Sequence, residues 1–69
     1  MTIDELRVHL THLIDTYVKD PAERASLQTF VGRDDVPVKY ILAEITPSLS
    51  GVISPADAIL LQDIVFNFC

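Results

Sequence analysis

The stretch Thr2 to Tyr17, TIDELRVHLTHLIDTY, contains both a helix start and a helical repeat of apolar residues. Glu5 follows Thr2 by three residues, which is the spacing of a capping box, where each side chain accepts a hydrogen bond from a free backbone N–H of the first turn. The apolar residues then fall on one helical stripe, which consists of Ile3, Leu6, Leu10, Leu13, Ile14 and Tyr17. The stretch therefore predicts an amphipathic helix over roughly residues 3–19.

The same kind of start signal occurs twice more along the chain. Asp20 precedes Pro21, and Ser54 precedes Pro55, so that each pair offers a capping side chain and then a proline at the first helical position. Carboxylates follow in both first turns, where the positive end of the helix dipole favours them. These signals predict helices over residues 21–31, ended by Gly32, and over residues 55–68.

The segment between these helices predicts a further helix over residues 36–46. Asp34 or Asp35 is placed to cap it, Pro37 falls in its first turn, and Pro47 with the following SLSG is placed to break it. The alternative is a strand over VPVKYIL, which is rich in β-branched residues, but no second stretch offers it a partner strand. We therefore expect an all-α fold, a small compact bundle of about four short helices.

The length and composition restrict what this bundle can be. A chain of 69 residues forms a single domain, residues 1–69, and buries only about 60% of its unfolded surface. With 49% hydrophobic residues, the chain has more apolar side chains than a small monomer easily hides, so self-association or a partner protein is expected. A net charge of −5 with only five lysines and arginines argues against nucleic acid as a partner and favours a basic protein surface.

The location is expected to be the cytoplasm. Cys69 is the only cysteine, so no internal disulfide forms, and the N-terminal residues lack the basic and apolar blocks of a signal peptide. The longest apolar run, AILL, is far shorter than the roughly 20 residues of a membrane span. We therefore expect no membrane association.

Chemistry by the chain itself is not predicted. Glu5, His9 and His12 have helical spacing that suits two or three metal ligands, but no second cluster completes a site, and a solvated helix surface explains them better. Cys69, at the end of the chain, is far in sequence from both histidines, so it has no base beside it. We predict no enzyme activity, no metal and no cofactor.

Surplus apolar and acidic residues are the candidates for binding. We predict a partner-binding patch made of Asp34, Asp35, Tyr40 and Glu44, because the aspartates start a helix and Tyr40 lies on a face that the core does not need. The last predicted helix is apolar all round, so it is either the central helix of the fold or is covered by another chain. In the second case Ile59 and Phe66 form a self-association face.

Two functional hypotheses follow from these observations. The first is a small acidic protein-binding module that occludes a partner's surface, as an immunity protein, an antitoxin or a phage-encoded inhibitor does. The alternative is a non-catalytic helical subunit or homodimer with a role in assembly. Both rest on size, charge and the lack of a catalytic set.

Overall fold

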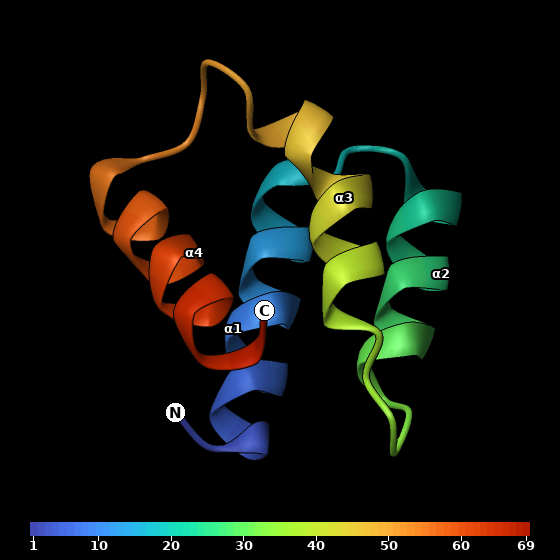
Figure 1. Ribbon diagram of the computed structural model, residues 1–69. Helices are drawn as coiled ribbons and strands as arrows, with labels where there is room; N and C mark the ends of the chain where they lie inside the picture. The colour runs from blue at the N-terminus through green and yellow to red at the C-terminus, as the bar shows by residue number, and fades with distance from the viewer.

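The computed structural model describes all residues from 1 to 69 and contains four helices and no strand. They are α1 (Ile3–Tyr17), α2 (Pro21–Val31), α3 (Val38–Leu49) and α4 (Pro55–Phe68) (Figure 1). The prediction of an all-α fold with four short helices is confirmed. None of the helices combines the length and the apolar character needed to cross a membrane.

Three of the four helices begin at the predicted capping residues. Thr2 Oγ1 accepts from the backbone N–H of Glu5 at 3.1 Å, and Glu5 Oε1 accepts from the backbone N–H of Thr2 at 2.9 Å, which completes the capping box. Asp20 and Ser54 each accept from a backbone N–H in the first turn of α2 and α4. These caps satisfy donors that the helix itself leaves free.

The ends of α1 and α2 lie close to the predicted positions. α1 ends at Tyr17 rather than at residue 19, because Val18 adopts an extended conformation (φ −82°, ψ 113°) and buries its side chain. α2 ends at Val31, with Gly32 as its C-cap as predicted. Gly32 has right-handed backbone angles (φ −78°), so the left-handed conformation that favours glycine is not used there.

The predicted start of the third helix is wrong. α3 begins at Val38 with Pro37 in the capping position, and no side chain caps it, so neither Asp34 nor Asp35 acts as its N-cap. Pro37 explains the shift, because the residue directly before a proline, here Val36, is disfavoured in the helical region. Both aspartates therefore lie in the linker, with exposed side chains.

The predicted end of this helix is also wrong, since Pro47 lies inside α3 and the helix continues to Leu49. A proline removes the hydrogen bond to the carbonyl four residues earlier, here that of Ala43. Both Ala43 and Pro47 are exposed, so water can satisfy the free carbonyl, while the buried Leu49 holds the last turn against the core. Gly51, with φ 78°, then turns the chain toward α4.

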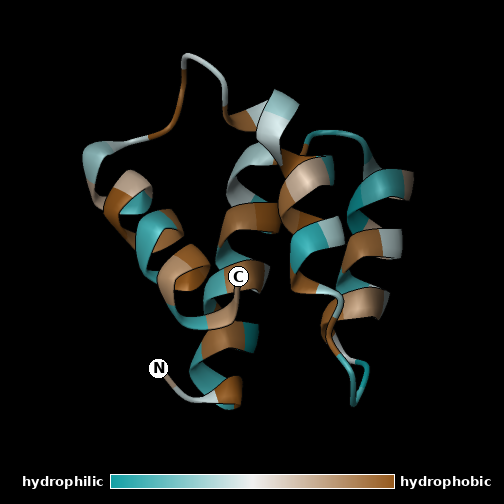
Figure 2. Ribbon diagram, viewed as in Figure 1, coloured by the Kyte–Doolittle hydropathy of each residue, from teal (hydrophilic) through white to brown (hydrophobic).

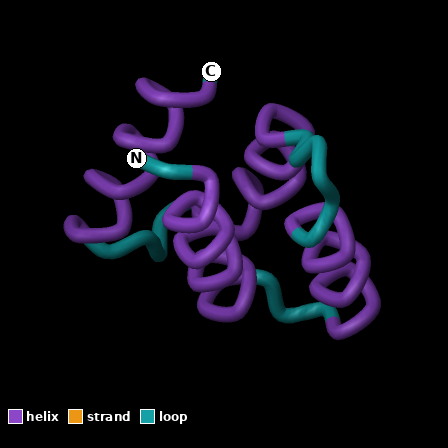
Figure 3. Tube along the Cα trace, turned by 90° about the horizontal axis from the view of Figure 1, so that it is seen from below, coloured by secondary structure: helices purple, strands orange, loops and turns teal.

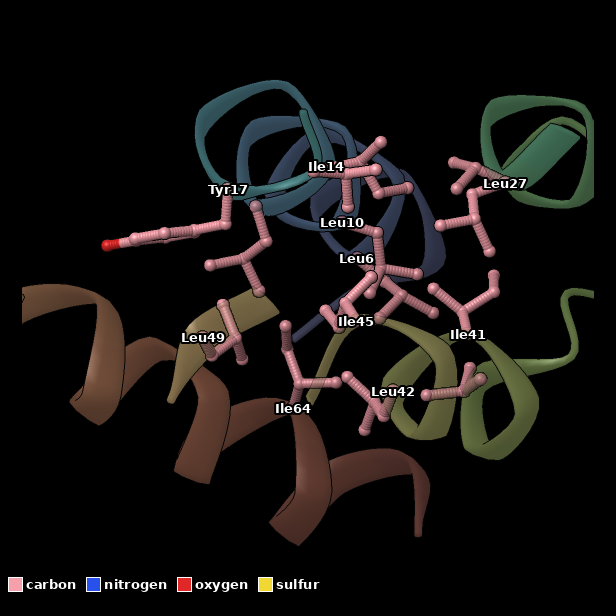
Figure 4. Packing of buried hydrophobic residues seen from close by; sticks show 14 residues of the cluster. Leu6, Leu10, Ile14, Tyr17, Leu27, Ile41, Leu42, Ile45, Leu49 and Ile64 are labelled. Atoms are coloured by element: carbon pink, nitrogen blue, oxygen red, sulfur yellow. The ribbon is translucent and has the colours of Figure 1, made fainter. Parts of the chain in front are cut away.

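α1 is the central helix of the fold. It packs against α2, α3 and α4, whereas those three helices contact one another much less. Seen from below in Figure 3, α3 and α4 lie apart from each other on the same side of α1. The close-up in Figure 4 shows side chains from α2, α3 and α4 converging on one side of α1. The residues that α1 contributes to the core are Leu6, Leu10, Leu13, Ile14 and Tyr17.

The hypothesis that the last helix is the central one is therefore wrong. α4 lies at the edge of the molecule, and Ile64 is its only buried residue. Leu60, Leu61 and Phe68 are partly buried against the core, but Val65 is about half-exposed. Figure 2 shows hydrophobic segments along the turns of this peripheral helix.

We predict that Ile64→Ala lowers the free energy of unfolding by about 2–5 kcal/mol, because it removes the one side chain of α4 that is enclosed by the core. The matched control is Ile59→Ala on the exposed side of the same helix, which should change that free energy by about 0.5 kcal/mol or less. Urea unfolding followed by circular dichroism measures both. Equal losses in the two variants would show that α4 is not anchored through Ile64.

Candidate functional site

A groove of about 480 Å³ lies where the start of α1, the linker before α3 and the end of α4 meet. Leu6 and Phe68 contribute apolar surface from α1 and α4. Asp34, Asp35 and the first residues of α3 form the other side. We call this feature the Asp34 groove; it is lined by Ile3, Leu6, Asp34, Asp35, Val36, Pro37, Val38, Lys39, Tyr40 and Phe68.

The two carboxylates of the Asp34 groove have no cationic partner in the chain. The ion pair of Arg7 with Asp4 and the hydrogen bond of His12 with Asp57 both lie elsewhere. Neither Asp34 nor Asp35 caps α3, and both are exposed. The groove therefore presents two negative charges that a basic partner can meet, against the single positive charge of Lys39.

The linker that carries these carboxylates is tied to α1 and α2. Arg7 of α1 donates from Nη2 to the backbone carbonyl of Arg33 at 3.1 Å. The Arg33 guanidinium lies over the ring of Phe30, 6.0 Å from its centroid, and so points toward an aromatic face instead of pairing with the neighbouring carboxylates. Arg33 N–H also donates to the carbonyl of Phe30 at 3.2 Å. These contacts fix the position from which Asp34 projects.

Tyr40 is held in place by Phe30 from α2. The two rings meet edge to face, with centroids 5.3 Å apart and planes at 79°. Such a pair contributes about 0.5–1.5 kcal/mol beyond its buried area, and it limits the directions that the half-exposed Tyr40 ring can take. Glu44 follows Tyr40 by one helical turn and is exposed, but it lies outside the groove.

The predicted self-association residues lie on a different surface. Ile59 and Phe66 are on the outer face of α4, with 61% and 87% of their surface exposed. The structure therefore separates the two predicted surfaces and brings together three of the four predicted partner-binding residues.

A polar cluster at the other end of α4 fixes this helix to α1. The Tyr17 hydroxyl donates to Asp57 Oδ2 at 2.6 Å and accepts from the backbone N–H of Ser54 at 3.1 Å. His12 Nε2 lies 2.9 Å from Asp57 Oδ1, and Figure 4 shows the Tyr17 ring extending from α1 toward the start of α4. The hydrogen bond from Tyr17, with further bonds from His12 and Ser54, lowers the pKa of Asp57 below its ordinary value.

This cluster is not predicted from the sequence. The helical spacing groups His12 with Glu5 and His9, as a solvated surface or alternatively as metal ligands, but Glu5 is engaged by Thr2, whose N–H and hydroxyl lower the pKa of Glu5. No group of three His, Cys, Asp or Glu side chains is arranged to hold a metal ion. The one available signal was Tyr17, a residue with a polar tip at the end of an otherwise aliphatic stripe.

Comparison of the chain with protein-family models, with curated proteins and with solved structures finds no match.

We predict that acid weakens the attachment of α4 through Asp57. Because the folded-state pKa of Asp57 is depressed, its contribution to stability is complete above the ordinary aspartate pKa of about 4 and is lost as the pH falls through the lower, folded-state pKa. The free energy of unfolding of Asp57→Asn should therefore fall less between pH 6 and pH 3 than that of the wild type. Urea midpoints across this range measure the difference.

The control for this experiment is Asp63→Asn, since the carboxylate of Asp63 makes no ion pair in the chain and only its backbone carbonyl accepts a hydrogen bond. This variant should keep the pH dependence of the wild type. If Asp57→Asn also keeps the pH dependence of the wild type, ionisation of Asp57 does not stabilise the attachment of α4.

Proposed function

We propose that this protein is a small acidic protein-binding module that acts by occluding the surface of a partner protein. The observation that carries the proposal is the Asp34 groove, which gathers two unpaired carboxylates and an oriented aromatic ring around an apolar floor. Immunity proteins, antitoxins and phage-encoded inhibitors work by occlusion of this kind, and the analogy rests on size and charge. The partner is expected to carry a basic surface.

The geometry supports a binding mechanism in two steps. The net charge of −5, with Asp34 and Asp35 at the rim, accelerates the encounter with a basic surface at low salt. Tyr40 then serves as the anchor, because its ring is already positioned by Phe30 and loses little rotational freedom when it is covered. Glu44 flanks Tyr40 and extends the acidic surface along α3.

Nucleophilic catalysis is the competing use of the polar side chains, and Thr16, His12 and Asp57 do follow the order of a nucleophile, a base and an orienting carboxylate. Their geometry favours a structural role. Thr16 Oγ1 lies 3.4 Å from His12 Nδ1 in a contact that is open to solvent. Thr16 also lies within α1, where backbone N–H groups bond to the preceding turn and cannot stabilise an oxyanion.

We predict that Asp34→Asn with Asp35→Asn lowers the association rate for the natural partner by about tenfold at low salt and has a smaller effect at high salt. The experiment immobilises wild-type and variant chains, identifies proteins retained from a lysate of the source cell, and measures binding of the purified partner by surface plasmon resonance. The matched control is Asp63→Asn, which removes a carboxylate at a distance from the groove. A partner bound equally by all three chains would contradict the role of the groove.

A second candidate function, a helical subunit or homodimer with a role in assembly, is favoured by the outer face of α4. Phe66, with 87% of its surface exposed, is a large apolar side chain that gains from burial against another chain. Ile59 lies on the same face two helical turns earlier, so the two side chains form a stripe. This stripe is separate from the Asp34 groove, and so both surfaces can be occupied at once.

We predict that, if this stripe mediates self-association, the wild type sediments as a dimer at micromolar concentration and Phe66→Asp sediments as a monomer. The charge would have to be buried without a partner in the dimer, whereas the monomer leaves it in water. Val52→Asp, at an exposed valine in the turn before α4, is the control and should leave the dimer intact. A wild type that is monomeric throughout this range rules out the homodimer.

A further inference from the structure

We propose that the partner binds by laying a basic amphipathic helix along the boundary between α3 and α4, with its positively charged end at Asp34 and Asp35. The inference rests on the proposed function and specifies the chemistry of the partner. The proposed contact surface is larger than the predicted patch. It includes one side of α4, and of that side only Phe68 lines the Asp34 groove.

The boundary between α3 and α4 is hollowed at both ends. The Asp34 groove lies at the start of α3 and the end of α4. A second hollow of about 380 Å³ lies at the end of α3 and the first half of α4, where Leu49, Ile53 and Leu61 line it. α3 and α4 both pack against α1 but contact each other little. In Figure 1 they flank α1 to the right and to the left, and the view from below in Figure 3 shows both on one side of it. Between the two hollows, the fully buried side chain of Ile64 points from α4 toward Leu42 and Leu49 of α3 (Figure 4).

The side of α4 that borders this boundary is an apolar stripe. Ala58 and Leu61 line the hollow at one end, and Phe68 lines the Asp34 groove at the other. Val65 is four residues after Leu61 and three before Phe68, so it lies on the same side of the helix between the two hollows. Val65 is 45% exposed, so it leaves apolar surface open to solvent between the two hollows.

The spacing of the hollows suits a helix as the occupant. Leu61 and Phe68 are seven residues apart on α4, which corresponds to about 10 Å along the helix axis at 1.5 Å per residue. Apolar residues separated by seven positions on a partner helix have the same separation and lie on one face. A helix that lies in a groove is recognised through anchors of this kind, at positions such as i, i+3 and i+7.

The charges select a basic occupant over a second copy of this chain. Asp34 and Asp35 stand at one end of the boundary without cationic partners, and α4 contains two aspartates and no lysine or arginine. An α4 helix from a second copy would bring further carboxylates and no compensating charge. A helix with lysines or arginines beside its apolar face pairs with the free carboxylates and also fills both hollows.

The experiment uses a synthetic peptide as the probe. A fluorescein-labelled helix of leucine and lysine, as long as α4 at 14 residues and with leucines at helical spacing, is titrated with the protein, and binding is followed by fluorescence anisotropy. A second peptide replaces every lysine with glutamate. We expect the lysine peptide to bind and the glutamate peptide to bind at least tenfold more weakly.

Substitutions at Val65 distinguish binding along the boundary between α3 and α4 from general charge attraction. Val65→Glu makes the protein more acidic, so attraction alone predicts tighter binding of the lysine peptide, whereas occupation of the boundary predicts at least tenfold weaker binding. Val65→Gln should weaken binding in the same direction without a change in charge. The matched control is Val8→Glu, at a valine on α1 with 66% of its surface exposed, which should bind within twofold of the wild type. Circular dichroism verifies that each variant is folded.

Four results would overturn the inference: no binding of the lysine peptide, equal binding of both peptides, wild-type or tighter binding by the Val65 variants, and a wild-type dimer that Val65→Glu converts to a monomer. The last result identifies a second copy as the occupant. The proposed function is judged separately on the natural partner. If a captured partner is lost when the Asp34 and Asp35 charges are removed but is retained by Val65→Glu, the proposed function stands. The binding of a helix along the boundary between α3 and α4 is then refuted.

Discussion

Burial of one side of α1 is the constraint on which the rest of the structure depends. No other helix makes extensive contact with all three of its neighbours, so α2, α3 and α4 are placed by how they pack onto α1. Leu6, Leu10 and Leu13 are fully enclosed. A larger protein would surround such residues with several layers of helices, whereas this small chain has one layer around α1. With a single central helix, the outer helices keep large parts of their surface in water. The surfaces proposed for binding are a direct result of this arrangement.

Most of the fold could be predicted from local signals, since the capping box at Thr2 and the caps at Asp20 and Ser54 are interactions within a few residues of the chain. The errors came from competing local rules at α3. Two aspartates preceded a proline, and the conformational limits of Pro37 outweighed their capping preference. The central helix could not be identified because α1 and α4 are both rich in apolar residues, and only the tertiary packing shows which one is enclosed.

The candidate site was predictable in part. Asp34, Asp35 and Tyr40 are near each other in sequence, and the fold brings all three to one groove. What the sequence could not reveal are the contacts between distant segments. The ring of Phe30 orients Tyr40 across the gap between two helices, and Phe68, from the far end of the chain, supplies part of the groove floor. The contact between Tyr17 and Asp57 spans 40 residues and is equally hidden from local patterns.

The attachment of α4 has a consequence for motion. The helix is fixed at its start by the bonds of Asp57 and in its middle by Ile64, whereas its last turn packs only through the partly buried Phe68. Opening this end therefore needs less free energy than unfolding of the unit formed by α1, α2 and α3. The last turn of α4, which follows Ile64, is therefore the part of this helix that opens at the lowest cost, and its opening widens the Asp34 groove that Phe68 lines.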